Sequence, residues 1–295
     1  MWDGRETHQK GSAAAIHFDL TVQANSATEG HAEAAVPVSQ ADREAIVAYQ
    51  MGLFTAQVYD RRAGSLTAAG AAGGPDVLAT QPFVFGVNDP LGCDPSGAQC
   101  TGVNAQFDPV VFTTFDAWSG ARGARGAIAR GQDLFNTFPI RITGVAGIND
   151  DFKVAAVPGT CTTCHDTPHA GDHSVPAPLD IGVADPPVPA HAGGNGVQNR
   201  FGLPVGDMPV YTLRHKLTGE IKLTTDPGRA LITGQWKDVG RMKGPILRGL
   251  SGRAPYFHNG AAATLGDVVE FYDRRFELRL SEQQKSDLVA FLRAL

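Results

Sequence analysis

The sequence predicts an all-α fold with long ordered loops and a minor β-hairpin. Segments of helical periodicity that begin with capping residues occur near both ends of the chain. Only one pair of segments has the composition of paired strands. The 295 residues include 35 Gly and 19 Pro, a content typical of ordered loops rather than of dense regular structure.

Three predicted helices begin with a hydroxyl residue followed three positions later by a polar partner, which is the capping-box pattern. The three pairs are Ser39 with Asp42, Thr264 with Asp267, and Ser281 with Gln284. Apolar residues follow each pair at helical spacing. We expect the first of these segments to be a core helix and the other two to close the chain as consecutive helices.

Two further helices and the hairpin are expected between these segments. Pro109 stands where a helix start tolerates proline, so Val110 to Trp118 is predicted as a short apolar helix. Ala124 to Asn136 is predicted as a second helix. The hairpin is predicted to pair residues 220–225 with residues 229–233 across an Asp-Pro-Gly turn.

Charge and hydropathy exclude several classes of partner. The chain has 25 basic and 30 acidic side chains, for a formal charge of −5. This balance provides no basic surface for nucleic acid or an anionic membrane. No stretch approaches the roughly 18 consecutive apolar residues that a membrane span needs. Residues 1–5 open the sequence without the basic and apolar regions of a secretory signal.

Residues 161–165 read Cys-Thr-Thr-Cys-His, the C-x-x-C-H pattern of covalent c-type haem attachment. In this pattern two thiols bond the haem vinyl groups and the His binds the iron. Two alternatives stay open. His169 and His173 would allow a structural zinc site with the two thiolates. A thioredoxin-like dithiol would need a surrounding βαβ pattern, which the sequence does not show.

The other two cysteines, Cys93 and Cys100, lie in a turn-rich segment that favours a disulfide closing a short loop. Two free thiols are the alternative. A disulfide and haem attachment both need an oxidising compartment, so we expect the bacterial periplasm. Residues 168–209 are rich in Pro and Gly, and we expect them to form a loop that wraps the haem.

Four blocks of sequence resemble the bacterial di-haem cytochrome c peroxidases and their MauG-type relatives. The blocks are Trp2-Asp3-Gly4-Arg5, the haem motif, Asp226-Pro227-Gly228-Arg229, and Pro245-Ile246-Leu247-Arg248 leading to Ala254-Pro255-Tyr256-Phe257-His258-Asn259-Gly260. The resemblance implies two all-α cytochrome c-like domains that each hold a haem. Residues 1–119 would be a remnant of the first domain, and residues 120–295 would be the second, a complete haem domain.

The resemblance also assigns the residues around this haem. Cys161 and Cys164 would form the thioether bonds, and His165 would be the proximal iron ligand. Tyr272 stands fourteen residues after the His of the Pro-Tyr-Phe-His block, where relatives place a distal ligand. Arg248 and His258, both from the last block, would also contact the cofactor.

The distal ligand has alternatives. Met208 or Met242 would give the iron a thioether, which suits a conventional electron-transfer cytochrome, and an open site is a third choice. A phenol oxygen from Tyr272 would favour ferric iron and lower the reduction potential. Tyr272 would otherwise be an ordinary core aromatic on the last helix but one.

The resemblance further suggests catalytic residues and calcium. Trp2 falls where the family has an indole between its two haems, and it would relay electrons. Glu29, His31 and Glu33 lie where the family has a catalytic carboxylate, which would move protons during O–O cleavage. Each could instead be a solvated surface residue. Calcium would bind carbonyls of the step Arg253-Ala254-Pro255, although the bulky cation weakens this expectation.

The family has its first haem motif before the Trp-Asp-Gly-Arg block, and this sequence has no second C-x-x-C-H. We expect that the chain starts at an internal Met of a longer protein whose signal segment lies upstream; a lineage with one haem is the alternative. The expected function is electron transfer coupled to hydrogen peroxide reduction or substrate oxidation, with a cytochrome c or cupredoxin as donor and a homodimer as the assembly. A mono-haem carrier and a structural zinc domain are the alternatives.

Overall fold

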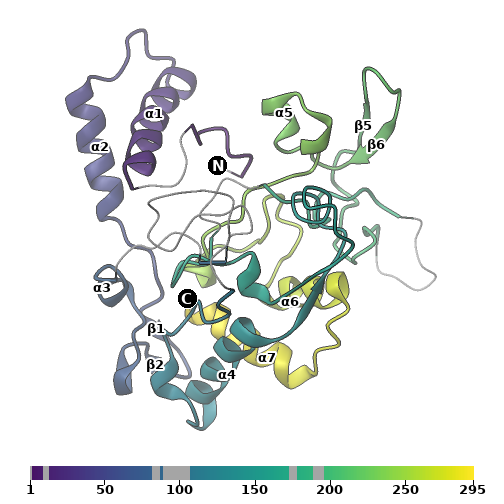
Figure 1. Cartoon of the computed structure of the whole chain (residues 1–295). Helices are drawn as coiled ribbons and strands as arrows, with labels where there is room; N and C mark the ends of the chain where they lie inside the picture. Colours follow the sequence, from purple (N-terminus) through teal and green to yellow (C-terminus); the bar gives the residue numbers. More distant parts are fainter. Residues whose placement is uncertain (1, 9–12, 82–86, 89–106, 173–177, 189–195) are drawn as a thin grey trace.

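The computed structural model describes residues 2–8, 13–81, 87–88, 107–172, 178–188 and 196–295, and these are mostly helical with little sheet (Figure 1). The helices are α1 (Ala13–His31), α2 (Gln40–Gly52), α3 (Pro75–Leu78), α4 (Gly123–Thr137), α5 (Ala230–Thr233), α6 (Leu265–Phe276) and α7 (Glu282–Ala294). The strands are β1 (Tyr59–Asp60), β2 (Gly64–Ser65), β3 (Ile140–Ile142), β4 (Val157–Gly159), β5 (Tyr211–Arg214) and β6 (Ile221–Thr224). They form three antiparallel pairs in sequence order. None of the helices in the described ranges has the length and hydropathy to cross a bilayer.

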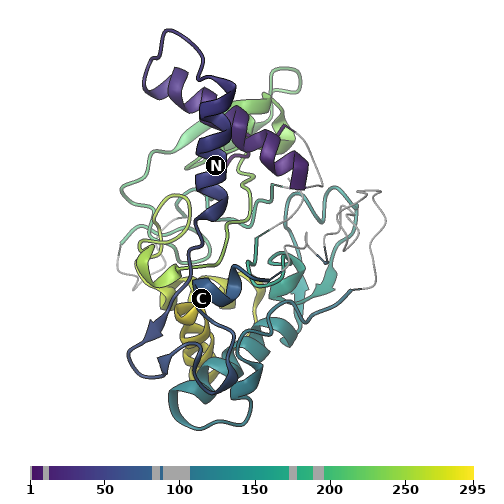
Figure 2. The same ribbon diagram turned by 90° about the vertical axis from the view of Figure 1, so that its left-hand side faces the viewer.

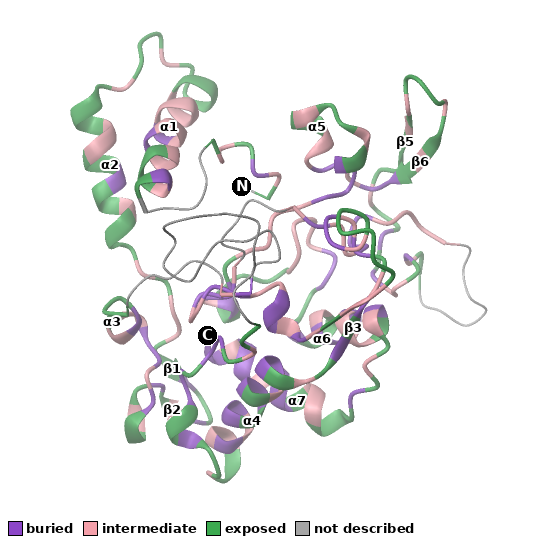
Figure 3. Cartoon of the chain, in the orientation of Figure 1, coloured by how far each residue is buried: buried purple, intermediate pink, exposed green. Residues whose placement is uncertain are grey.

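The main core forms where α4 crosses α7 at Gly131. A Cβ atom at this position would lie 2.0 Å from the carbonyl oxygen of Asp287 and 2.7 Å from the Cβ of Phe291, so only glycine permits the approach. The rings of Phe135 and Phe291 meet at a centroid distance of 5.5 Å. Arg130 adds two hydrogen bonds to the Asp287 carboxylate at 2.8 and 2.9 Å. Figure 3 shows the buried faces of the two helices turned toward each other.

The predicted helix at residues 109–118 is wrong, because only Asp116–Trp118 form a 3₁₀ turn. The buried backbone of Phe112 finds its partners on another element instead. Its N–H donates to Asn136 Oδ1 at 3.1 Å, and Asn136 Nδ2 donates to its carbonyl at 2.7 Å. An amide side chain on α4 thus replaces the hydrogen bonds that a local helix would supply.

The capped helices are confirmed. Each predicted first residue accepts a hydrogen bond from the backbone amide three positions later; the three N-caps are Ser39, Thr264 and Ser281. The helix predicted at 124–136 is also confirmed, as α4.

The prediction that the helix after Ser39 is a core helix is wrong. In α2 only Val47 is buried, while Tyr49 is 69% exposed. This helix packs on α1, and both views show the pair standing apart from α4 and α7 (Figures 1 and 2).

The hairpin was predicted with the wrong partner. Strand β6 pairs with β5, which precedes it, and residues 230–233 form α5 instead of a strand. The Asp-Pro-Gly step does not reverse the chain onto β6, because the Arg229 N–H donates to the Arg241 carbonyl at 3.1 Å.

The main core cluster includes Phe112 as well as Phe291, so it draws on both sides of the expected boundary at residues 119 and 120. The two-domain division stays a prediction.

Candidate functional site

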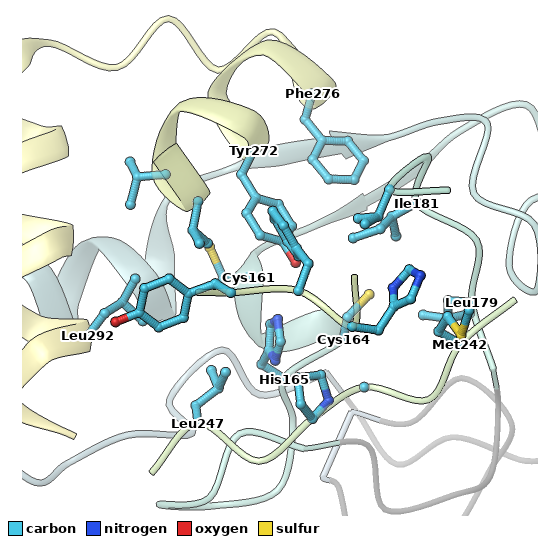
Figure 4. Close-up of a pocket in the computed structure, with 18 of the residues that line it drawn as sticks. Cys161, Cys164, His165, Leu179, Ile181, Met242, Leu247, Tyr272, Phe276 and Leu292 are labelled. Carbon is cyan, nitrogen blue, oxygen red and sulfur yellow. The ribbon is translucent and has the colours of Figure 1, made fainter. Parts of the chain in front are cut away.

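An apolar cavity of about 270 Å³ lies between α6, α7, the β3–β4 pair and the segment 240–258. Its walls are mainly aliphatic and aromatic, and include Phe135, Ile142, Leu247, Val269, Leu288 and Leu292. Cys161, Cys164 and His165 lie on one wall, as Figure 4 shows. The structure therefore brings the whole C-x-x-C-H motif to the edge of one cavity.

A tight turn presents these three side chains. Residues Cys161–Thr163 form a 3₁₀ turn whose N-cap is Thr160, with Thr160 and Thr163 exchanging side-chain and backbone hydrogen bonds. The N–H groups of Cys164 and His165 both donate to the Cys161 carbonyl, at 3.2 and 3.0 Å. This pattern fixes the backbone of the motif before any ligand binds.

His165 is oriented by a hydrogen bond on the side away from the cavity. Its Nδ1 lies 2.6 Å from the carbonyl oxygen of Gly171, so Nδ1 carries the proton and donates it. Burial lowers the pKa of His165, which keeps the ring neutral. Nε2 is then left with its lone pair for a metal, the arrangement expected of a metal-binding imidazole with an oriented partner.

Tyr272 projects from α6 into the same cavity and points toward the cysteines (Figure 4). Burial raises the pKa of its phenol well above the ordinary value. Met242 also lines the cavity. Met208 is not among the lining residues, and its sulfur lies 3.6 Å from Asn259 Nδ2. The structure thus places two of the three candidate distal ligands at the cavity, Tyr272 and Met242.

The cavity fits the group that the motif implies. Two thiols can form thioethers, one neutral imidazole can bind iron, and the apolar walls suit a flat hydrophobic macrocycle. The zinc alternative used His169, whose Nδ1 lies 3.3 Å from Thr114 Oγ1. Within the described ranges, no three His, Cys, Asp or Glu residues are grouped to hold a metal ion. His173, Cys93 and Cys100 lie outside the described residues.

Trp2 lines both this cavity and a second cavity. The second cavity, of about 390 Å³, shares Trp2, Met242 and His258 with the first and adds charged residues of the N-terminal and Asp-Pro-Gly-Arg blocks. The rings of Trp2 and His258 meet edge to face at 6.1 Å. His258 is buried, and its Nε2 lies 3.3 Å from a carboxylate oxygen of Asp226. The sequence blocks that carry the resemblance therefore meet in space.

The remaining candidates do not reach the cavity. Glu29, His31 and Glu33 are exposed at and just after the end of α1, and none lines either of the two cavities. Arg248 is not a lining residue either. Its guanidinium stacks on the Phe54 ring at 4.1 Å, and its Nε donates to the His169 carbonyl at 2.8 Å.

The sequence analysis did not identify two residues at the site, Gly171 and Lys243. Gly171 supplies the carbonyl that orients His165, and a glycine shortly after a ligand His was its only signal. Lys243 lines the cavity directly before the block at residues 245–248, and that adjacency would have singled it out.

No family model matches the sequence. Among curated proteins, the chain is 32% identical over 155 residues to cytochrome-c peroxidase IdrP1 of Pseudomonas sp. (strain SCT), covering 46% of this chain and 36% of the relative. It is 28% identical over 243 residues to cytochrome-c peroxidase IdrP1 of Denitromonas iodatirespirans, covering 75% and 54%. The chain spans about a third to about half the length of these two relatives.

A solved structure of a MauG-like protein associated with microbial copper homeostasis matches with a TM-score of 0.38 and 17% identity, covering 100% of this chain and 72% of that chain. Both of these curated IdrP1 relatives are cytochrome-c peroxidases, and the chain is similar to them in sequence over part of their length.

Proposed function

We propose that this chain binds one haem c in the apolar cavity and serves electron transfer coupled to hydrogen peroxide reduction or substrate oxidation. The observation that supports it best is the placement of Cys161, Cys164 and a correctly oriented His165 on one wall of the cavity. The resemblance that assigns these residues is independent of that geometry. The haem, when bound, supplies an iron that changes oxidation state.

In this proposal each wall has a separate task. Cys161 and Cys164 would hold the macrocycle by thioether bonds, and His165 Nε2 would bind the iron while Nδ1 keeps its proton and donates it to the Gly171 carbonyl. Tyr272 faces the cavity with a neutral phenol that becomes a ligand only when a metal lowers its pKa. The aliphatic walls exclude water, which strengthens charge interactions inside the cavity.

Trp2 and His258 provide a route for electrons at the mouth of the cavity. Trp2 is 40% exposed, lines the cavity and contacts the His258 ring. In this proposal it would carry electrons between the surface and the haem. Glu29, His31 and Glu33 stay candidates for proton transfer, at the surface of α1. Arg248 stays a candidate for contact with the cofactor. We include in the proposal a cytochrome c or cupredoxin donor, a homodimer, a periplasmic location, and calcium at the carbonyls of residues 253–255.

A mono-haem electron carrier is the second candidate, and Met242 is the observation that favours it. Its thioether lines the cavity, and a His–Met pair of iron ligands is typical of electron-transfer cytochromes. The two functions differ in one measurable respect, because a carrier exchanges electrons reversibly without consuming peroxide.

The test expresses the full chain together with cytochrome c maturation enzymes and measures its intact mass. We expect an increase equal to one haem, lost in the C161A/C164A variant and kept in the matched C93A/C100A variant. An unchanged mass in the parent chain contradicts both haem functions. Peroxide consumption with reduced cytochrome c as donor supports the peroxidase, and reversible electron exchange without it supports the carrier.

A further inference from the structure

Two cationic side chains line the otherwise apolar cavity. Lys243 and Arg253 both belong to the segment 240–258, which lines part of the cavity. Arg253 is exposed at the mouth, and Lys243 is half-buried. A positive charge beside apolar walls is costly unless a negative group or water compensates it, so these two positions need an explanation.

The two cations have no carboxylate partner within the described part of the chain. Lys243 Nζ donates to the Gly244 carbonyl at 3.1 Å, and Arg253 Nη1 donates to the Ile246 carbonyl at 3.2 Å. Each group keeps further N–H donors for another acceptor. The carboxylate on the cavity lining, Asp180, is 3.6 Å from Lys222 instead. Neither cation of the cavity lining is therefore paired with a carboxylate among the described residues.

The backbone holds both positions independently of a ligand. The Lys243 N–H donates to the Trp2 carbonyl at 2.5 Å, which ties this residue to the N-terminal block. The Arg253 N–H donates to the Leu250 carbonyl at 3.0 Å at the end of a 3₁₀ turn. Cations held in place before binding lose less entropy when they meet an anion.

We infer that Lys243 and Arg253 bind the two carboxylates of the tetrapyrrole, an inference that rests on the proposed haem function. A haem is apolar over most of its surface and carries its negative charge on two propionate groups. The cavity has the same pattern, with mainly apolar walls and two cations on the segment 240–258. Arg248 does not take this role, because its guanidinium is held on Phe54 and is not part of the lining.

The pairing predicts the sign of a redox effect. Reduction of ferric haem removes one positive charge from the centre, so a nearby cation stabilises the reduced form. Removing a cation therefore shifts the reduction potential to a more negative value. It also raises the pKa of the propionate that it neutralised, so the pH-dependent part of the potential moves to higher pH.

The experiment compares haem-loaded full-length variants by redox titration from pH 4 to 9, after intact mass has shown haem in each. We expect K243Q and R253Q each to shift the potential negatively and to move its pH-dependent part to higher pH. K243R and R253K should restore the parent values. The matched control K216Q removes an exposed cation of the β5–β6 turn, outside the cavity lining, and should change neither.

The outcomes separate this inference from the proposed function. If the parent chain gains no haem mass, the proposed function has failed. If it gains haem and the loaded R253Q variant keeps the parent potential and pH dependence, the inference is overturned while the proposed function stands. Arg253 is exposed, so its variant folds even where a change at Lys243 would not.

Discussion

The Nδ1 atom of His165 lies 2.6 Å from the carbonyl oxygen of Gly171, six residues further along the chain. Gly171 has a φ of +68°, a conformation that glycine adopts without strain. Its α-carbon also packs closely, since an added Cβ would lie 2.8 Å from a Leu247 methyl carbon and 2.9 Å from the Phe112 ring. The core therefore fixes the Gly171 carbonyl that orients His165, the proposed iron ligand.

Replacing Gly171 with Ala should disturb the ligand as well as the fold. We expect a loss of about 2 kcal/mol in unfolding free energy from backbone strain and overlap. In the proposed haem-loaded chain we also expect a more positive potential, because a weaker hydrogen bond at Nδ1 would make His165 a less basic ligand. Chemical denaturation and redox titration measure the two effects.

Gly234→Ala is the matched control for this change. Gly234 also has a positive φ, of +66°, but no atom lies within 4 Å of the Cβ that Ala would add. It should cost about 1 kcal/mol of stability and leave the potential unchanged. Equal potentials in the parent and in Gly171→Ala would show that the hydrogen bond has no influence on the iron.

Tyr272→Phe and Met242→Leu distinguish the two distal candidates at the cavity. If Tyr272 binds the iron, its replacement alters the ferric absorption spectrum and raises the potential, while Met242→Leu leaves both unchanged. Tyr256→Phe is the matched control, because Tyr256 also lines the cavity but donates its hydroxyl to the Leu250 carbonyl at 2.8 Å. It should lose about 1 kcal/mol of stability and keep the parent spectrum. The reverse pattern would assign the ligand to Met242.

Gly131→Ala should separate α4 from α7. The added methyl would overlap the Asp287 carbonyl, so the helices must move apart, at a cost of about 3 kcal/mol or more. Gly252→Ala is the control, because no atom lies within 4 Å of its added Cβ, and it should change stability by less than about 0.5 kcal/mol. Urea unfolding measures both. Similar midpoints for the two variants would mean that the close approach at Gly131 does not occur.

Asp60 should make stability depend on pH. Burial alone raises the pKa of this carboxyl, but the amides of Ala63 and Arg62 and the Arg293 guanidinium outweigh it, so the pKa is below its ordinary value. Its stabilisation is therefore complete above the ordinary Asp pKa and is lost as pH falls through the lower folded value. Asp60→Asn should cost about 2 kcal/mol at pH 7 and much less at pH 2.

Asp133→Asn, at an exposed position of α4, is the control for Asp60 and should be neutral at both pH values. Urea unfolding at pH 7 and pH 2 provides the comparison. A cost for Asp60→Asn that stays the same at both pH values would contradict the lowered pKa.

The sequence predicted the elements whose signals are local. The helices that begin after Ser39, Thr264 and Ser281 were found because a cap and its partner lie within one turn. The segment around Phe115 was predicted wrongly. The backbone N–H of Phe115 donates to Gln132 Oε1 at 2.8 Å, on another element, instead of to a local helix partner. Such long-range replacement of backbone partners leaves no trace in a short window of sequence.

The candidate site divides in the same way. The C-x-x-C-H motif places Cys161, Cys164 and His165 together by spacing alone, and the structure puts all three on one wall. The hydrogen-bond partner of the His165 ring and the two cations of the cavity lining depend on how distant segments pack. Lys243 and Arg253 become visible as a pair only in the folded chain, when both line one cavity.

The order of the cavity walls along the chain has a consequence for how the haem becomes attached. The wall that holds Leu288 and Leu292 follows Cys161 by most of the second half of the chain, so it closes through contacts of long sequence separation. Once it has closed, burial raises the pKa of Cys161 to about 12, and the sulfur stays a poorly nucleophilic thiol. In the proposed haem form, the Cys161 thiol would therefore react more readily with a vinyl group before this wall closes than after it.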